Sequence, residues 1–136
     1  MVGILLLSHG NLCEGILQSA QVVLGDCDRI KAIPVQADDN IDDFSKKVES
    51  AVNEMDDGGG VLILVDILGG TPFNKSALLL RGNKITIVTG LNLPMLFAAI
   101  EGRYQDLPLN ELAENCKKEG ISGIKSTRDF LKDSDF

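Results

Sequence analysis

Four short apolar runs constrain the fold of this chain more than any other feature. They cover residues 2–7, 30–35, 61–65 and 85–89, and each is rich in Val, Ile or Leu. Apolar and polar residues do not alternate within them, which is typical of strands covered on both faces in a parallel sheet. Each run is also far shorter than the roughly 20 apolar residues that a membrane helix needs. The sequence therefore predicts a buried, mainly parallel sheet and no membrane span.

Segments with helical spacing lie between the runs. Between residues 12 and 24 the apolar residues share one helical face, and Gly25 follows as a stop signal. The same pattern repeats between residues 41 and 55, after a capping cluster at 38–40 and before three glycines at 58–60. We expect both segments to be amphipathic helices that cover the sheet.

Two further helices are predicted from capping signals. Thr71 before Pro72 is typical of an N-cap followed by the first helical residue, and this helix should continue to about Leu80. Pro94 fits the first turn of the next helix.

The C-terminal part is expected to hold one more helix, a short strand and a tail. Residues 107–118 have helical spacing, and Gly120 follows as a stop signal. Residues 121–125 fit an antiparallel edge strand, whereas 132–136 should be frayed. A chain of 136 residues has the usual size of one compact domain, so we expect a single domain over residues 1–131 and a short tail.

The alternation of strand and helix predicts an α/β fold. We expect a three-layer, doubly wound sheet with right-handed crossovers and helices on both faces. The short doubly wound strand order 2-1-3-4 makes the first and third strands neighbours. Ligands bind such sheets beyond the carboxyl ends of the strands, where the strand order reverses.

Composition excludes several functions. The net charge is −7 and no Lys/Arg cluster is present, so we expect no nucleic-acid partner; the acidic surface suits a basic protein partner, or is simply that of an ordinary soluble bacterial protein. Three scattered cysteines and one histidine indicate free thiols in a reducing cytoplasm and no metal site. The familiar nucleotide-binding glycine motifs are missing, and no cofactor is expected.

Three loops at the carboxyl edge of the predicted sheet contain the candidate chemistry: residues 8–10, 66–72 and 90–94. His9, the only histidine, would face Asp66 across the point where the strand order reverses. One ring nitrogen of a neutral imidazole can attack phosphorus while the other donates its proton to a carboxylate. His9 and Asp66 are therefore the candidate catalytic pair. The alternatives are a histidine that only caps or hydrogen-bonds, and an aspartate that only binds backbone N–H groups.

Glycines near this pair are candidates for binding a phosphate. Gly69 and Gly70 precede a helix start, where exposed N–H groups and the helix dipole favour an anion, and Gly10 leaves the other helix entrance similarly open. The Thr71 hydroxyl is a further donor. Glycine pairs also serve tight turns, and Thr71 is also explained as an ordinary N-cap.

Three motifs together resemble one family. Leu-Ser-His-Gly at 7–10, Asp-Ile-Leu-Gly-Gly-Thr-Pro-Phe-Asn at 66–74 and Gly-Leu-Asn-Leu-Pro-Met-Leu at 90–96 are similar to those of the IIA components of mannose-class phosphoenolpyruvate-dependent sugar phosphotransferase systems (PTS). The resemblance spans roughly residues 1–125. It implies a soluble phosphotransferase with His9 as the phosphorylated residue and Asp66 as its carboxylate partner.

The resemblance also implies partners. Such proteins accept a phosphoryl group from the carrier HPr, pass it to a IIB component, and are often homodimers. With no IIB sequence in this chain, we expect IIB as a separate polypeptide and contact with the membrane only through the IIC/IID permease. Ser8, Asn92 and Pro94 are expected at the rim of the site or against a partner. The sequence does not identify the sugar.

Two other functions remain open at this point. The phosphocarrier subunit of dihydroxyacetone kinase also uses an N-terminal histidine in a similar fold, although the stretch at 69–74 argues against it. A non-catalytic regulatory domain could use His9 as a ligand contact. Only the two phosphocarriers would gain phosphate.

Overall fold

The computed structural model describes residues 1–135, in which four strands and five α-helices alternate. Their order is that predicted from the sequence through the last α-helix, which was expected at 107–118. The α-helices and strands are, in chain order, β1 (Gly3–His9), α1 (Leu12–Leu24), β2 (Ile30–Val35), α2 (Ile41–Met55), β3 (Val61–Val65), α3 (Thr71–Ala77), β4 (Ile85–Thr89), α4 (Leu93–Tyr104) and α5 (Leu109–Ser122). Short 3₁₀ turns follow at Leu78–Leu80, Thr127–Asp129 and Asp133–Asp135.

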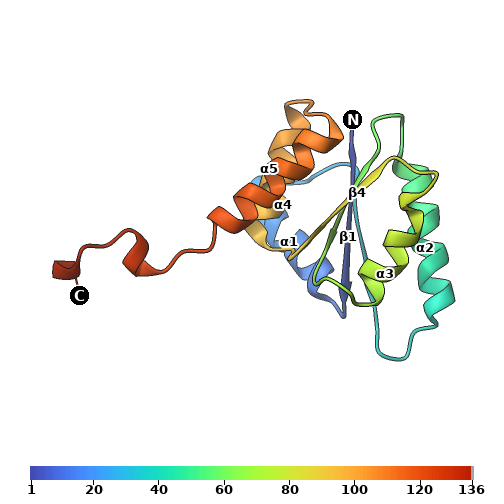
Figure 1. Ribbon diagram of the computed structural model, residues 1–136, viewed down its shortest axis with the longest axis horizontal. Coiled ribbons are helices and arrows are strands. Elements are labelled where there is room, and N and C mark those ends of the chain that lie inside the picture. Colours follow the sequence, from blue (N-terminus) through green and yellow to red (C-terminus); the bar gives the residue numbers. More distant parts are fainter. Residues whose placement is uncertain (136) are drawn as a thin grey trace.

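The sheet has the strand order β2-β1-β3-β4, and all three pairings are parallel. The predicted order 2-1-3-4 is therefore confirmed. β1 lies between β2 and β3, so that Leu7 pairs with Ile33 on one side and with Val65 on the other. Figure 1 shows the sheet in the middle of the molecule, with helices on both sides of it.

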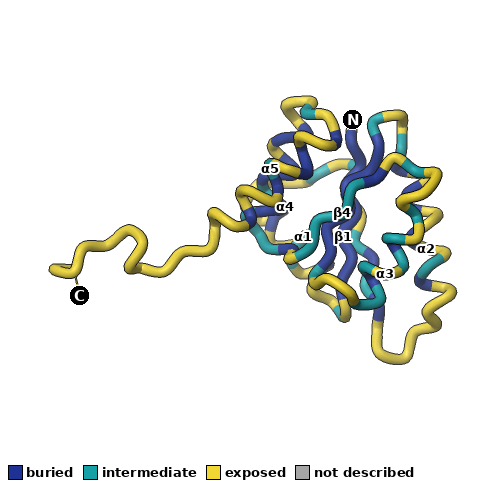
Figure 2. Tube along the Cα trace, in the orientation of Figure 1, coloured by how far each residue is buried: buried dark blue, intermediate teal, exposed yellow. Residues whose placement is uncertain are grey.

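Two apolar clusters explain why the strands lack alternation. One face of the sheet packs against α1, α4 and α5, and the other against α2 and α3. Along β3, Leu62 and Leu64 belong to the first cluster and Ile63 to the second, and all three are fully buried. Burying one such side chain contributes about 1.5–3 kcal/mol. Both faces therefore require apolar residues, as the dark central strands in Figure 2 show.

The predicted N-cap region of α2 is confirmed, whereas that of α3 is shifted by one residue. Asn40 caps α2 because its side-chain oxygen accepts a hydrogen bond from the backbone N–H of Asp43 at 3.0 Å. The prediction of Thr71 as an N-cap was wrong: Gly70 is the N-cap of α3, Thr71 is already helical, and Pro72 is the second helical residue. Gly70 takes the extended conformation that an N-cap needs, with φ −83° and ψ 175°.

The predicted C-terminal strand at 121–125 was also wrong. Helix α5 runs through Gly120 and ends at Ser122, and the described part of the sheet has only four strands. Gly120 does not stop the helix; a Cβ there would lie 2.8 Å from the Met95 Cε, so this glycine allows α5 to approach α4 closely. Glycine at a helix-helix contact and glycine at a helix end look alike in sequence.

The segment after α5 leaves the body of the protein (Figures 1 and 2). All residues from Ile121 to Asp135 are exposed, and residue 136 of the predicted frayed tail lies outside the described residues. No helix within residues 1–135 is long and apolar enough to cross a membrane.

Candidate functional site

The site is built where β1 and β3 end side by side. His9 is the last residue of β1, and Asp66 directly follows β3. Because Leu7 pairs with Val65, both residues emerge at the same edge of the sheet. Asp66 Oδ2 accepts a hydrogen bond from the His9 backbone N–H at 2.8 Å and also lies 2.8 Å from His9 Nδ1. The two residues expected to face each other are thus in direct contact.

This contact distinguishes the two ring nitrogens of His9. The carboxylate beside Nδ1 favours the tautomer in which Nδ1 holds the proton, which leaves the lone pair on Nε2. The His9 side chain is 47% exposed, whereas that of Asp66 is only 9% exposed. A partner can therefore reach the imidazole while the carboxylate stays covered. The pair has the geometry of a nucleophile and the group that orients it.

Hydrogen bonds keep the Asp66 carboxylate charged. Burial alone would raise its pKa, but the backbone and ring of His9 and the Ile67 N–H outweigh burial, so the pKa is lowered. The Ile67 N–H donates to Asp66 Oδ1 at 2.8 Å, so both carboxylate oxygens are engaged. A carboxylate that accepts several N–H bonds is stabilised in its ionised form.

Gly70 forms the other support of the imidazole. A Cβ on Gly70 would lie 2.5 Å from His9 Cε1 and 2.9 Å from Nε2, so the ring rests almost against the glycine backbone. Only a residue without a side chain fits there. The imidazole is thus held between the Asp66 carboxylate and the start of α3.

A cavity of about 560 Å³ opens beside the ring. The predicted residues His9, Gly10 and Thr71 line it, whereas Gly69, Gly70 and Asp66 do not. Gly10 has φ +61° and Gly69 φ +85°, which are conformations that favour glycine. The remaining lining residues are Val35, Gln36, Ala37, Asp39 and Ile41.

Sequence analysis missed the wall that follows β2. Gln36 and Asp39 lie in the β2–α2 loop, which ends at the same edge of the sheet as the three loops that were singled out. The rule that ligands bind at the carboxyl ends of strands applied to this loop as well. It was missed because it contains no glycine motif and no histidine.

Ser8 lies beneath the site, not at its rim. Its side chain is fully buried; Oγ donates to the Gly10 carbonyl at 2.8 Å and accepts from the Cys13 N–H at 2.8 Å. Ser8 thereby holds the turn from β1 into α1. Burial raises the pKa of the Cys13 thiol, so this cysteine is a packing residue and not a nucleophile.

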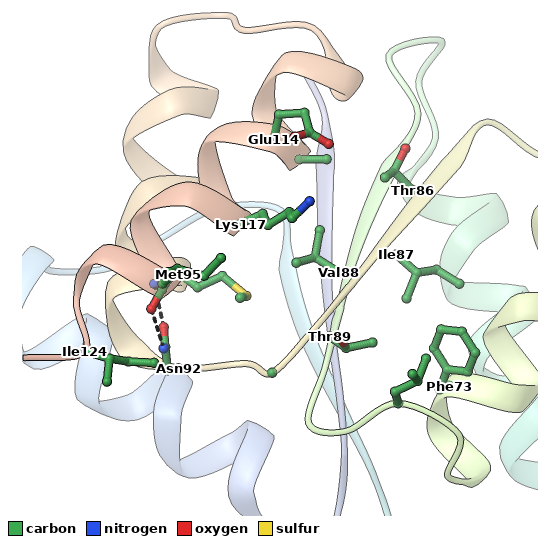
Figure 3. Close-up of a pocket in the computed structure, with 15 residues that line it drawn as sticks. Phe73, Thr86, Ile87, Val88, Thr89, Asn92, Met95, Glu114, Lys117 and Ile124 are labelled. Carbon is green, nitrogen blue, oxygen red and sulfur yellow. Dashed lines mark hydrogen bonds between the residues drawn. The ribbon is translucent and has the colours of Figure 1, made fainter.

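Asn92 and Pro94 face α5. Asn92 Oδ1 accepts from the Met95 N–H at 3.0 Å, and its Nδ2 donates to the Gly120 carbonyl at 3.0 Å (Figure 3). Pro94 packs where a Cβ on Gly123 would lie. Neither residue lines the cavity beside His9; Asn92 lines a second cavity of about 600 Å³ between β4 and α5.

Within residues 1–135, no group of three or more His, Cys, Asp or Glu side chains is arranged to hold a metal ion.

The close approach of Gly70 to His9 gives a first prediction. Gly70→Ala should fold, because φ −83° is ordinary for alanine, but the new methyl group must push the imidazole away from Asp66. The phosphoryl transfer to His9 that the sequence resemblance leads us to expect should then fall by about 10 to 100-fold, the range seen when a histidine loses its orienting partner in metal sites. Rapid-quench transfer measures this.

The matched control is Gly15→Ala. Nothing lies within 4 Å of a Cβ at Gly15, and alanine in a helix is more stable than glycine by about 0.8–1 kcal/mol. Gly15→Ala should therefore keep full transfer. Equal transfer in the two variants would mean that the ring does not depend on Gly70.

The chain is similar to IIA proteins of sugar phosphotransferase systems. The model of the EIIA-man family, described as the PTS system fructose IIA component, matches residues 3–117. The mannose-specific EIIAB component of Escherichia coli K12 is 28% identical over 128 residues, which are 93% of this chain and 40% of that protein. The fructose-specific EIIA component of Bacillus subtilis 168 is 28% identical over 118 residues, 86% of this chain and 80% of that one.

A solved structure agrees with these matches. The phosphotransferase system component EIIA of Streptococcus agalactiae is 30% identical, with a TM-score of 0.86; the likeness covers 95% of this chain and 99% of that one. The chain spans about two fifths of the length of the mannose-specific relatives it matches.

Proposed function

This chain belongs to the EIIA-man family of PTS IIA components, and on that premise we propose that His9 carries the phosphoryl group during sugar uptake. IIA components of this system carry phosphate from HPr to a IIB component. The observation that supports His9 is its contact with Asp66, at 2.8 Å through both the ring and the backbone. No other described side chain combines a nucleophilic nitrogen, exposure and a carboxylate partner at this edge.

The proposed step is a transfer between two histidines. The Nε2 lone pair attacks phosphorus, the nitrogen–phosphorus bond of the donor breaks, and the donor ring keeps the electron pair of that bond. Nδ1 of His9 keeps its proton and its hydrogen bond to Asp66, so the carboxylate balances the positive charge that develops on the ring. Transfer onward reverses these events toward the acceptor.

Neutral groups are proposed to bind the phosphoryl oxygens. We assign this role to the backbone N–H groups of Gly69 and Gly70 and to the Thr71 hydroxyl. Gly10 was also expected to bind phosphate, but its N–H donates to the Val35 carbonyl at 2.8 Å, so it shapes the cavity wall instead. Gly10 and Thr71 line the cavity beside His9, and Gly70 touches the ring. For Ser8, Asn92 and Pro94 the contacts support an indirect role, in which they hold the two loops at this edge.

The proposed partners are HPr as donor and a IIB component as acceptor, with the membrane reached only through the IIC/IID permease. We propose that the protein works in the cytoplasm. We propose that the membrane components of the system recognise the sugar, so that His9 and its cavity do not identify it.

The test is incubation with phosphoenolpyruvate, enzyme I and HPr, followed by mass spectrometry. One phosphoryl group should appear that is labile in acid and stable in alkali, as a phosphohistidine is. A protein that gains no phosphate under these conditions would be a binding module, and the proposed function would be wrong.

A homodimer is proposed as the assembly. Among the described residues no strand pairs with the outer edge of β4, and exposed apolar side chains lie beside it: Leu68, Ile121 and Ile124, which are 71%, 65% and 73% exposed. An unpaired edge next to apolar surface is a site that association can cover. This support comes from β4 and replaces the C-terminal strand that the structure does not contain.

Light scattering should give twice the 14.6 kDa mass of the chain. Ile124→Asp should shift the protein toward monomer, because it places a charge in the apolar surface. Val22→Asp, at an 82% exposed position on α1, is the control and should leave the dimer intact. A mass of 14.6 kDa for the wild type at all concentrations would contradict the proposal.

A further inference from the structure

The cavity beside His9 is lined by the side-chain amide of Gln36, to which the proposed function assigns no role. Gln36 follows β2 directly and lines the cavity together with His9. Its Nε2 donates to Asn11 Oδ1 at 2.6 Å. Asn11 is the residue before α1, two positions after His9. The Gln36–Asn11 pair therefore bridges the loop after β2 and the loop that directly follows His9.

Other hydrogen bonds already hold these two loops together. The Gly10 N–H donates to the Val35 carbonyl at 2.8 Å. Within its own loop, the Gln36 N–H donates to Asp39 Oδ2 at 2.8 Å and the Gln36 carbonyl accepts from the Asp39 N–H at 3.1 Å. The backbone of Gln36 is thus fixed without its side chain. The side-chain amide is therefore not needed to hold the Gln36 backbone in place.

The cavity lacks a cation where one would be useful. Among the residues that line it, only His9 and Asp39 have titratable side chains, and Asp39 is an acid. A phosphoryl group on Nε2 would bring about −1.5 to −2 charges into this space, if it resembles other phosphorylated side chains. The oxygens must then be met by neutral donors. A glutamine amide has two donor hydrogens, and Asn11 accepts only one of them.

We propose that Gln36 is a second phosphate-binding side chain of this site: its amide donates to an oxygen of the phosphoryl group on His9, and Asn11 is a positioning residue that holds the amide in place. This inference rests on the proposed function of His9. Asn11 stands at the N-cap position of α1, but its side chain makes no capping hydrogen bond to this helix. It accepts a hydrogen bond from Gln36 instead. If the Asn11 amide instead donates to the side-chain oxygen of Gln36, both N–H groups of Gln36 are unused.

The decisive variant is Gln36→Glu, which keeps the size of the side chain but replaces a donor with a negative charge. Phosphoryl acceptance from isolated phosphorylated HPr should slow by about tenfold or more, since hydrogen bonds to charged groups are the stronger ones. Gln36→Ala should slow it less, because it removes the donor without adding repulsion. Gln105→Glu is the matched control, since it adds the same charge at an exposed position after α4, and it should react like the wild type.

A purely structural link predicts a different pattern. It would make Gln36→Ala, Gln36→Glu and Asn11→Ala equally slow and would lower the free energy of unfolding in all three. A contact with the phosphoryl group also predicts that the side-chain amide resonances of Gln36 shift in the NMR spectrum when His9 of the wild type is phosphorylated. Unshifted resonances, or acceptance by Gln36→Glu as fast as by Gln105→Glu, would overturn the inference while the role of His9 stands. If the wild type accepts no phosphate at all, the proposed function fails and this inference with it.

Discussion

His9→Ala is expected to leave a folded protein that accepts no phosphoryl group from phosphorylated HPr. The imidazole is 47% exposed at the end of β1, so its loss removes the nucleophile without opening a cavity in either apolar cluster. Substitutions at such exposed positions usually change stability by less than about 0.5 kcal/mol. Here the loss of the contact with Asp66 adds to that cost. Intact mass spectrometry should show no added phosphate, and circular dichroism should show the wild-type fold.

A variant that still gains phosphate would refute His9 as the acceptor. The acid stability of the adduct then separates a phosphate ester of a hydroxyl group from a phosphoramidate. Ser8 is fully buried and its hydroxyl is engaged by Gly10 and Cys13, so an acid-stable adduct points to Thr71, which lines the cavity.

Asp66→Asn is expected to slow phosphoryl transfer by about 10 to 100-fold, by analogy with carboxylates that orient metal-bound histidines. Asparagine has one acceptor oxygen where Asp66 uses two, and it has no charge to balance the imidazolium. The free energy of unfolding should fall by about 1–3 kcal/mol, because one backbone N–H loses its partner. Rapid-quench transfer and urea unfolding measure the two effects separately.

The pH dependence of stability provides a second readout. Because the pKa of Asp66 is lowered in the native state, its carboxylate adds stability at neutral pH that is lost as the pH falls through this lowered value. The wild type should therefore be more stable than Asp66→Asn at neutral pH, and the difference should shrink in acid. Asp106→Asn is the control for removal of a charge, since Asp106 lies beyond α4 with φ +56°, which asparagine tolerates. Wild-type transfer speed in a folded Asp66→Asn protein would reject the role of the carboxylate.

The sheet could be predicted from the sequence because two independent signals, the apolar runs and the alternation of strands with helices, indicate the same topology. The central strands β1 and β3 are covered on both faces, so every residue of β3 is apolar, and the strand order follows from the commonest short topology. Once that order holds, the contact between His9 and Asp66 follows from where β1 and β3 end. The site could thus be located before any side chain was placed.

Glycine was the main source of error because its two uses look alike in sequence. Gly120 was interpreted as the end of a helix, but it lies within α5 and allows this helix to pack on Met95. Gly70 was interpreted as part of an open loop, but it also forms the surface on which the His9 ring rests. Close contacts between distant segments leave no local pattern. Gln36 was missed for the same reason, since its importance comes from Asn11 and His9, which are far from it in the chain.

The double contact of Asp66 with the backbone and the ring of His9 has a kinetic consequence. If His9 carries the phosphoryl group as proposed, a ring fixed at Nδ1 and supported by Gly70 offers one nitrogen in one direction, so donor and acceptor approach by the same route. Two proteins cannot occupy that route together, and each must leave before the other arrives. A carrier of this geometry follows ping-pong kinetics, in which an excess of unphosphorylated donor competes with the acceptor and slows the delivery of phosphate.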